Sequence, residues 1–84
     1  MIPRLKNERF ILLRERLNMS QERLAETVGL TQSMISRIES GEMNPSTPNI
    51  IKLITFFNNK LAELGEQKIT VDWLFFEKFL ELNS

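Results

Sequence analysis

Apolar residues recur along this chain with the spacing of α-helices. Phe10, Leu13 and Leu17 stand at i, i+3 and i+7, which predicts a first helix from about Arg4 to Leu17. With only two valines and abundant Leu, Glu, Arg and Lys, the whole chain favours helix over strand. A second, longer stripe predicts a helix that ends before Gly65, and it is formed by Ile50, Leu53, Ile54, Phe57, Leu61 and Leu64.

Two shorter helices between these stripes are marked by their capping residues. Ser20 and Thr31 each precede a helical segment, so they predict N-caps for helices at 21–28 and about 32–40. Residues that adopt a left-handed conformation are expected where the first three helices end. The candidates for these positions are Asn18, Gly29 and Gly41.

The C-terminal half carries two further helix-start signals. Thr47 followed by Pro48 predicts an N-cap and a first helical residue for the fourth helix. Thr70 predicts the cap of a last helix from Val71 to about Leu82. The sequence therefore predicts an all-α fold of five helices, without repeats or linkers, that forms a single domain over residues 1–84.

Composition narrows the classes of function. Hydrophobic residues make up 42% of the 84 residues, which is enough for one small core and too much for a disordered chain. Cys, His and Tyr are absent, so we expect no disulfide, no metal site, no cofactor and no imidazole or thiolate catalysis. Two carboxylate pairs at helical spacing are typical of a solvated helix face, so no enzyme is expected from Glu63 with Glu66 or Glu77 with Glu81.

No segment of the chain has the pattern of a membrane span or a signal peptide. The longest apolar run is four residues, whereas a span needs about 20. We therefore expect a cytoplasmic protein with no membrane partner.

Charge is distributed unevenly although its net value is zero. Residues 1–37 carry seven basic and four acidic side chains, and residues 38–84 carry four basic and seven acidic ones. A basic half suits a surface that meets a polyanion, and an ordinary solvated helix surface accounts for the same excess. Charge alone leaves both interpretations open.

Residues 19–41 carry the most specific pattern, MSQERLAETVGLTQSMISRIESG. The small Ala25 precedes the turn at Gly29, and Ile35 and Ile38 fall on one side of the next helix. Together with Asn-Pro after the third helix and Val-Asp-Trp-Leu from Val71, this segment resembles the Xre family of helix-turn-helix regulators, which share the lambda-repressor-like fold. The resemblance covers roughly residues 8–57 and 69–76, and it implies that the second and third helices form the helix-turn-helix.

The resemblance also implies that the third helix lies in the DNA major groove and reads base edges with its first residues. Glutamine side chains bond adenine, arginine side chains fork onto guanine, and serine pairs with either. A solvated polar helix face is the alternative interpretation of the same residues. The candidate readers are Gln32, Ser33, Ser36 and Arg37.

Phosphate contacts are expected on either side of the reading helix. Gln21 begins the second helix and matches a glutamine that, in related repressors, binds a phosphate and braces the residue equivalent to Gln32. Asn44, in the loop after the third helix, is a second candidate donor. Basic residues near the N-terminus are more typical of ordinary surface charges, namely Arg4, Lys6 and Arg9.

A structural ion pair and three departures from the family complete the comparison. Arg14 and Glu39 match positions that pair in related repressors, so we expect a scaffold role for them. Glu42 stands where Lys or Arg is common, which weakens the expected phosphate clamp. The segment 58–68 is longer than the usual link, so the fourth helix is expected to extend by two turns. The third departure is a pair of apolar residues where charged ones are usual, Ile11 and Leu12.

The last predicted helix carries apolar side chains on two sides. They form two stripes, namely Trp73, Phe76 and Leu80, and Phe75, Phe79 and Leu82. A helix that lies on a core needs one stripe. The second stripe is expected to cover either the extended fourth helix with Ile11 and Leu12, or a second copy of the chain. We favour the second copy, and therefore a homodimer that assembles through this helix.

Two functions of different classes follow from these observations. The first is a sequence-specific transcriptional regulator that binds an inverted-repeat operator in double-stranded DNA as a homodimer. It would act as a repressor or as a phage, plasmid or restriction–modification control protein. The second is an antitoxin-like protein-interaction module with secondary DNA binding. The sequence predicts no domain for a small-molecule effector.

Overall fold

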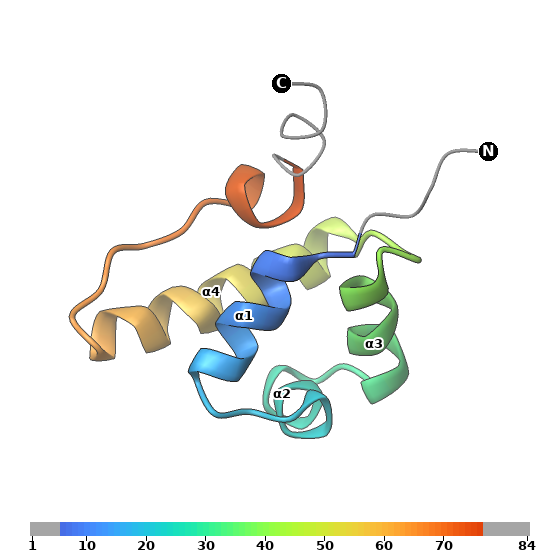
Figure 1. The fold of residues 1–84 in the computed structure, drawn as a ribbon, viewed down its shortest axis with the longest axis horizontal. Coiled ribbons are helices and arrows are strands. Elements are labelled where there is room, and N and C mark those ends of the chain that lie inside the picture. Colours follow the sequence, from blue (N-terminus) through green and yellow to red (C-terminus); the bar gives the residue numbers. More distant parts are fainter. Residues whose placement is uncertain (1–5, 77–84) are drawn as a thin grey trace. The chain divides into compact units, whose positions relative to one another are not determined.

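The computed structural model describes residues 6–76, which divide into two compact units after Asn44. The first unit holds α1 (Glu8–Arg16), α2 (Gln21–Val28) and α3 (Gln32–Ser40), as Figure 1 shows. The second holds α4 (Thr47–Glu63) and the short π-helix η1 (Asp72–Phe76). The part of the chain that is described contains no strand, and none of its helices is long and apolar enough to cross a membrane. The predicted all-α fold with five helices is confirmed.

Every helix of the first unit begins at a side chain that accepts a backbone hydrogen bond. Such bonds satisfy N–H groups that the first turn of a helix leaves without an intrahelical partner. The predicted caps at Ser20 and Thr31 are confirmed, whereas the predicted helix start at Arg4 is wrong because Asn7 caps α1 at Glu8. The three bonds run from Phe10 N to Asn7 Oδ1 (3.1 Å), from Arg23 N to Ser20 Oγ (3.0 Å) and from Met34 N to Thr31 Oγ1 (3.1 Å).

The first three helices are followed by residues in the left-handed conformation, as the sequence predicts, and α4 is followed by one as well. Their φ angles are 57° at Asn18, 76° at Gly29, 79° at Gly41 and 71° at Gly65. The chain then folds back on the last turn, as after α3, where Gly41 N donates to the carbonyl of Ile38 at 3.2 Å. These return bonds satisfy carbonyls that the last turn leaves unpaired.

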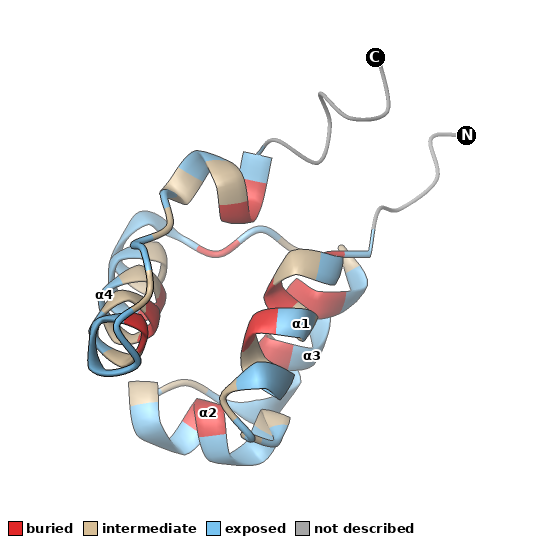
Figure 2. Ribbon diagram, turned by 60° about the vertical axis from the view of Figure 1, so that its left-hand side comes forward, coloured by how far each residue is buried: buried red, intermediate tan, exposed pale blue. Residues whose placement is uncertain are grey.

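The core of the first unit is apolar. Phe10 of α1, Leu24 of α2 and Ile35 of α3 are fully buried, and α3 contacts both α1 and α2. Ala25 and Ile38 are also buried. In Figure 2 the buried positions form one side of each of these helices.

In the second unit, α4 buries one face, on which Leu53, Phe57 and Leu61 are spaced four residues apart. Leu64, which the sequence assigns to the same stripe, follows the helix and is 56% exposed. The predicted cap at Thr47 is wrong, because Ser46 is the N-cap and makes no side-chain cap bond. Proline is tolerated at several positions of a first turn, so Pro48 does not by itself locate the helix start.

The segment between α4 and η1 is tied to α4 by one amide side chain. Asn58 Nδ2 donates to the carbonyl of Ile69 at 3.1 Å, and Ile69 N donates to Asn58 Oδ1 at 2.8 Å. Thr70 Oγ1 accepts from Trp73 N at 3.1 Å, as the predicted cap requires.

The last described element differs from its prediction. Asp72–Phe76 forms a π-helix instead of the start of an α-helix, and residues 77–82 of the predicted helix lie outside the described residues. A π turn brings neighbouring residues closer together around the helix axis than an α turn does. This geometry suits the burial of the adjacent Leu74 and Phe75.

Candidate nucleic-acid interface

The connection between α2 and α3 spans residues 29–31 and turns on Gly29. Its φ of +76° lies in the left-handed region, which residues with a Cβ rarely adopt. A Cβ built on Gly29 would meet no atom within 4 Å, so the backbone conformation, not a close neighbour, requires glycine here. The turn joins α2 and α3, which pack against each other, and this pair is the predicted helix-turn-helix.

The third helix separates its side chains into a buried side and a polar outer side. Ile35, Ile38 and Glu39 are buried. The polar outer side is formed by residues in the first turns of α3, and these turns are where a helix in the major groove meets base edges. Its exposed residues include all four candidate readers, Gln32, Ser33, Ser36 and Arg37.

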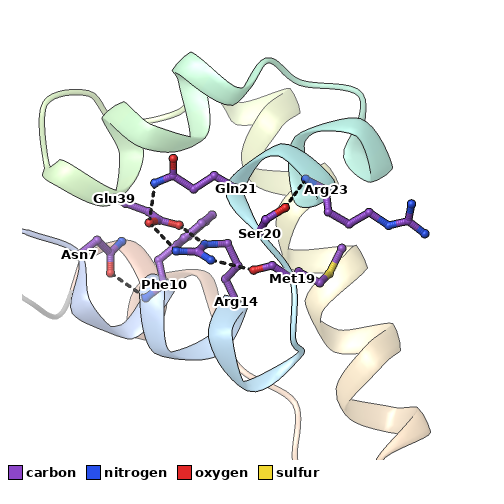
Figure 3. Close-up of polar contacts among 8 residues, drawn as sticks. All are labelled: Asn7, Phe10, Arg14, Met19, Ser20, Gln21, Arg23 and Glu39. Carbon is purple, nitrogen blue, oxygen red and sulfur yellow. Dashed lines mark hydrogen bonds and ion pairs between the residues drawn. The ribbon is translucent and has the colours of Figure 1, made fainter.

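Glu39, on the buried side, joins the three helices of the first unit through its carboxylate. Arg14 Nε donates to Oε2 at 2.5 Å, and Arg14 Nη2 donates to Oε1 at 3.1 Å. Gln21 Nε2 also donates to Oε1, at 3.0 Å. Figure 3 shows these side chains converging on Glu39 from α1 and from the start of α2.

The same cluster holds backbone segments in place. Arg14 Nη1 donates to the carbonyl of Met19 at 2.7 Å, in the loop between α1 and α2. Asn7 N donates to the carbonyl of Glu39 at 2.8 Å, which links the start of α1 to the end of α3. Together these bonds orient the helix-turn-helix on α1.

The Arg14–Glu39 ion pair is shielded from water. Only 12% of the Arg14 side chain and 6% of the Glu39 side chain are exposed. The hydrogen bond with Glu39 raises the pKa of Arg14, the negative charge of Glu39 adds to this, and burial opposes it. The ion pair implied by the family resemblance is therefore present, and Arg14 is engaged in the scaffold.

Gln21 occupies its predicted place, but its amide faces a different partner. The predicted brace runs to Gln32, whereas the amide nitrogen donates to Glu39 near the other end of α3. This bond uses one N–H of the amide, and the brace to Gln32 stays a prediction. An amide nitrogen carries two hydrogens, so one N–H of Gln21 remains for a further acceptor.

A shallow polar hollow lies beside this cluster. Its volume is about 330 Å³, and it is lined in part by Lys6, Gln21, Ser36 and Ser40. Two candidate DNA contacts, Gln21 and Ser36, are thus brought to one place from different helices. Lys6 adds an exposed positive charge there, and Glu15 adds an exposed negative one.

The loop after α3 contains the other candidates. Asn44 is exposed, as a phosphate donor must be. Arg37 Nε lies 3.9 Å from Glu42 Oε2, so the acidic residue after Gly41 pairs with a candidate reader. Arg9 is half-buried on α1, and Arg4 lies outside the described residues.

Sequence reasoning missed two parts of this site. Asn7 is buried, caps α1 and connects to Glu39, and its position three residues before the buried Phe10 is the local signal for such a cap. The carbonyl of Met19 as a partner of Arg14 has no local signal.

Comparisons with known proteins agree with this geometry. The model of a family described as helix-turn-helix matches residues 11–64. An uncharacterized HTH-type transcriptional regulator YgzD from Bacillus subtilis is 38% identical over 52 residues, which are 62% of this chain and 79% of the relative. No solved structure matches the chain significantly.

Two further relatives carry the same description of uncharacterized HTH-type transcriptional regulator. The protein from Archaeoglobus fulgidus is 37% identical over 51 residues, which are 61% of this chain and 72% of the relative. The protein from Haemophilus influenzae is 38% identical over 52 residues, which are 62% of this chain and 53% of the relative. With its capped α2, its turn at Gly29 and its polar outer face on α3, the chain belongs to the Xre-type helix-turn-helix family that its sequence resembles.

Proposed function

We propose that this chain is a sequence-specific DNA-binding regulator of transcription that lays α3 in the major groove. The observation that carries this proposal is the division of α3, whose buried side is joined to α1 and α2 while its outer side is polar and exposed. Gln32, Ser33, Ser36 and Arg37 read base edges from this outer side.

Gln21 and Asn44 contact phosphates and orient α3 in the groove. Gln21 is the first residue of α2, where free N–H groups and the helix dipole favour an anion. Its bond to Glu39 sets the direction of the amide and leaves one N–H for a phosphate oxygen. Lys6, on the same hollow, adds a charge that attracts the DNA backbone.

Selection of bound sequences from random double-stranded DNA tests this proposal with the purified chain. We expect an inverted repeat to be enriched and binding to weaken steeply as salt is raised. Absence of enrichment at low salt, with the protein folded, would contradict sequence-specific binding.

Four alanine variants separate the two kinds of contact. Gln32→Ala and Arg37→Ala should each relax the preference at one or two positions of a half-site. Gln21→Ala and Asn44→Ala should weaken binding to all sequences together. If Gln32→Ala weakened every sequence equally and left base preferences intact, α3 would not be the reading helix.

We further infer that residues 1–84 act as one binding domain that pairs with a second copy. The contact is made by the aromatic segment near the C-terminus, which contains Trp73, Phe75, Phe76 and Phe79. Phe76, in η1, is 44% exposed, and an exposed aromatic side chain favours burial against a partner. A two-fold pair would set two reading helices about 34 Å apart, one DNA turn, on an inverted repeat. This arrangement suits a repressor or a phage, plasmid or restriction–modification control protein.

Two variants test the assembly. Phe76→Glu and Phe79→Glu, the second outside the described residues, should give folded monomers with weaker operator binding. Sedimentation measures the oligomeric state, and circular dichroism confirms the fold. A variant that remains dimeric at micromolar concentration would place the contact elsewhere.

An antitoxin-like interaction module is the second candidate. Leu12, on α1, is 65% exposed, and a large apolar side chain on the surface favours a polypeptide partner. This function predicts a stable complex with a separate protein that survives high salt. It gains support if no DNA sequence is enriched in the selection.

A further inference from the structure

The end of α3 holds Glu42 at a defined place beside the reading helix. Glu42 N donates to the carbonyl of Arg37 at 2.9 Å, in the return of the chain after Gly41. Met43 N lies 3.3 Å from the same carbonyl. The backbone of Glu42 is therefore fixed relative to Arg37 by the helix cap, independently of either side chain.

The side chains of the two residues approach in a particular orientation. The nearest contact joins Arg37 Nε to Glu42 Oε2 at 3.9 Å. Arginine binds guanine through a fork of two parallel N–H groups, and the terminal nitrogens Nη1 and Nη2 supply one such fork. A carboxylate beside Nε leaves the Nη1–Nη2 fork available to a base.

Glu42 also contributes a negative charge beside the reading helix. The only charged residues from Gln32 to Asn44 are Arg37, Glu39 and Glu42. Glu39 is buried and paired with Arg14, so Arg37 and Glu42 are the two charges left at the outer side. A carboxylate at this place repels phosphates of every sequence equally.

We propose that Glu42 is a positioning residue that sets specificity by holding Arg37 for one guanine and by repelling the DNA backbone. This inference rests on the proposed DNA binding through α3. It assigns Glu42 two effects of opposite direction. The carboxylate weakens binding to unrelated DNA, and it strengthens the preference for the base pair that Arg37 reads.

The experiment compares Glu42→Gln with the wild type on three duplexes. These are the selected operator, the operator changed at the base pair whose preference is lost in Arg37→Ala, and an unrelated duplex. Fluorescence anisotropy at two salt concentrations gives the affinities. We expect Glu42→Gln to bind the unrelated duplex about two- to fivefold more tightly at low salt and to lose about three- to tenfold of the discrimination at that base pair.

Two controls assign the effect to the Arg37–Glu42 pair. Glu63→Gln removes one exposed carboxylate from the last turn of α4 and should leave discrimination unchanged. In the Arg37→Ala background, Glu42→Gln should change discrimination no further. Thermal unfolding should differ little among the variants, because 60% of the Arg37 side chain and 45% of the Glu42 side chain are exposed.

The outcomes distinguish this inference from the proposed function. A wild type that shows no discrimination between duplexes contradicts sequence-specific DNA binding itself. A wild type that discriminates while Glu42→Gln discriminates equally well overturns the role of Glu42 alone. A loss of discrimination that persists in the Arg37→Ala background, or an Arg37→Ala variant that keeps every preference, also overturns it.

Discussion

Each of the two units of this chain is stabilised internally, and the contacts that do so differ between them. In the first unit, side chains cap all three helices, and the buried carboxylate of Glu39 binds groups from α1 and α2. In the second unit, α4 starts at Ser46 without a side-chain cap bond and presents a plain apolar face. In the link that follows α4, the side-chain amide of Asn58 binds both backbone groups of Ile69.

The two kinds of contact differ in how closely they fix the orientation of a helix. Apolar contacts hold helices together without fixing their rotation closely, whereas charged hydrogen bonds act only within narrow limits of distance and angle. A reading helix has to present its outer residues in a fixed direction, so a polar cluster behind α3 suits that task. α4 carries no candidate reader, and an apolar stripe suffices for it.

The largest expected effect comes from breaking the polar cluster. Glu39→Ala should lower the free energy of unfolding by about 3–5 kcal/mol, because it leaves the shielded charge of Arg14 without its partner. Chemical denaturation followed by circular dichroism measures this. Glu42→Ala is the matched control, since its exposed pair with Arg37 contributes at most about 1 kcal/mol. Equal stability of the two variants would show that the cluster does not hold the first unit.

The corresponding change in the second unit removes the amide that ties the link. Asn58→Ala should lower the free energy of unfolding by about 1–3 kcal/mol, because the backbone N–H and carbonyl of Ile69 lose their partners. Asn59→Ala, at the exposed neighbouring position, should change it by less than about 0.5 kcal/mol. Limited proteolysis should also cut residues 64–70 faster in Asn58→Ala. An unchanged cleavage rate would mean that other contacts hold the link.

A smaller effect is expected to be the same in both units. Gly29 and Gly65 have φ angles of 76° and 71°, and a Cβ at either would meet no atom within 4 Å. Gly29→Ala and Gly65→Ala should therefore each cost about 1–2 kcal/mol of backbone strain. Thermal unfolding compares the two. A much larger cost at Gly29 would reveal a packing role for the turn that its surroundings do not indicate.

The smallest effect concerns pH. Because the pKa of Arg14 is raised above its usual high value, the stability that its charge contributes is present below that value and is lost only as pH rises through it. Raising the pH from about 7 to about 11.5 should leave this contribution intact. Arg14→Lys should lose its contribution as the pH rises past about 10.4, the ordinary pKa of lysine, because the lysine then loses its charge. Parallel pH profiles for the two proteins would contradict this assignment.

Most local features of both units could be predicted from the sequence alone. Ser20, Thr31 and Thr70 cap helices, and Gly29 and Gly41 close them, as predicted. These signals act between residues three to five positions apart, so a short stretch of sequence contains all of their physics. The exposure of the four candidate readers follows from the same helical period.

Weak local signals led to the errors. Pro48 fits more than one place in a first turn, so it located the start of α4 one residue late. The aromatic residues from Trp73 onward fit an α-helical stripe, yet the backbone of Asp72–Phe76 forms a π-helix. Neither the position of a proline nor the spacing of aromatic residues shows which residues the fold buries.

Apart from the Arg14–Glu39 pair, which the family resemblance implied, the partners of the buried polar groups became apparent in the folded structure alone. Gln21 and Glu39 are 18 residues apart, Arg14 and Glu39 are 25 apart, and Asn58 and Ile69 are 11 apart. Each of these side chains could form hydrogen bonds with groups on its own helix. Which partner it takes depends on which other helix or link lies beside it. Hydrogen bonds select partners by distance and angle in space, which positions along the chain do not specify.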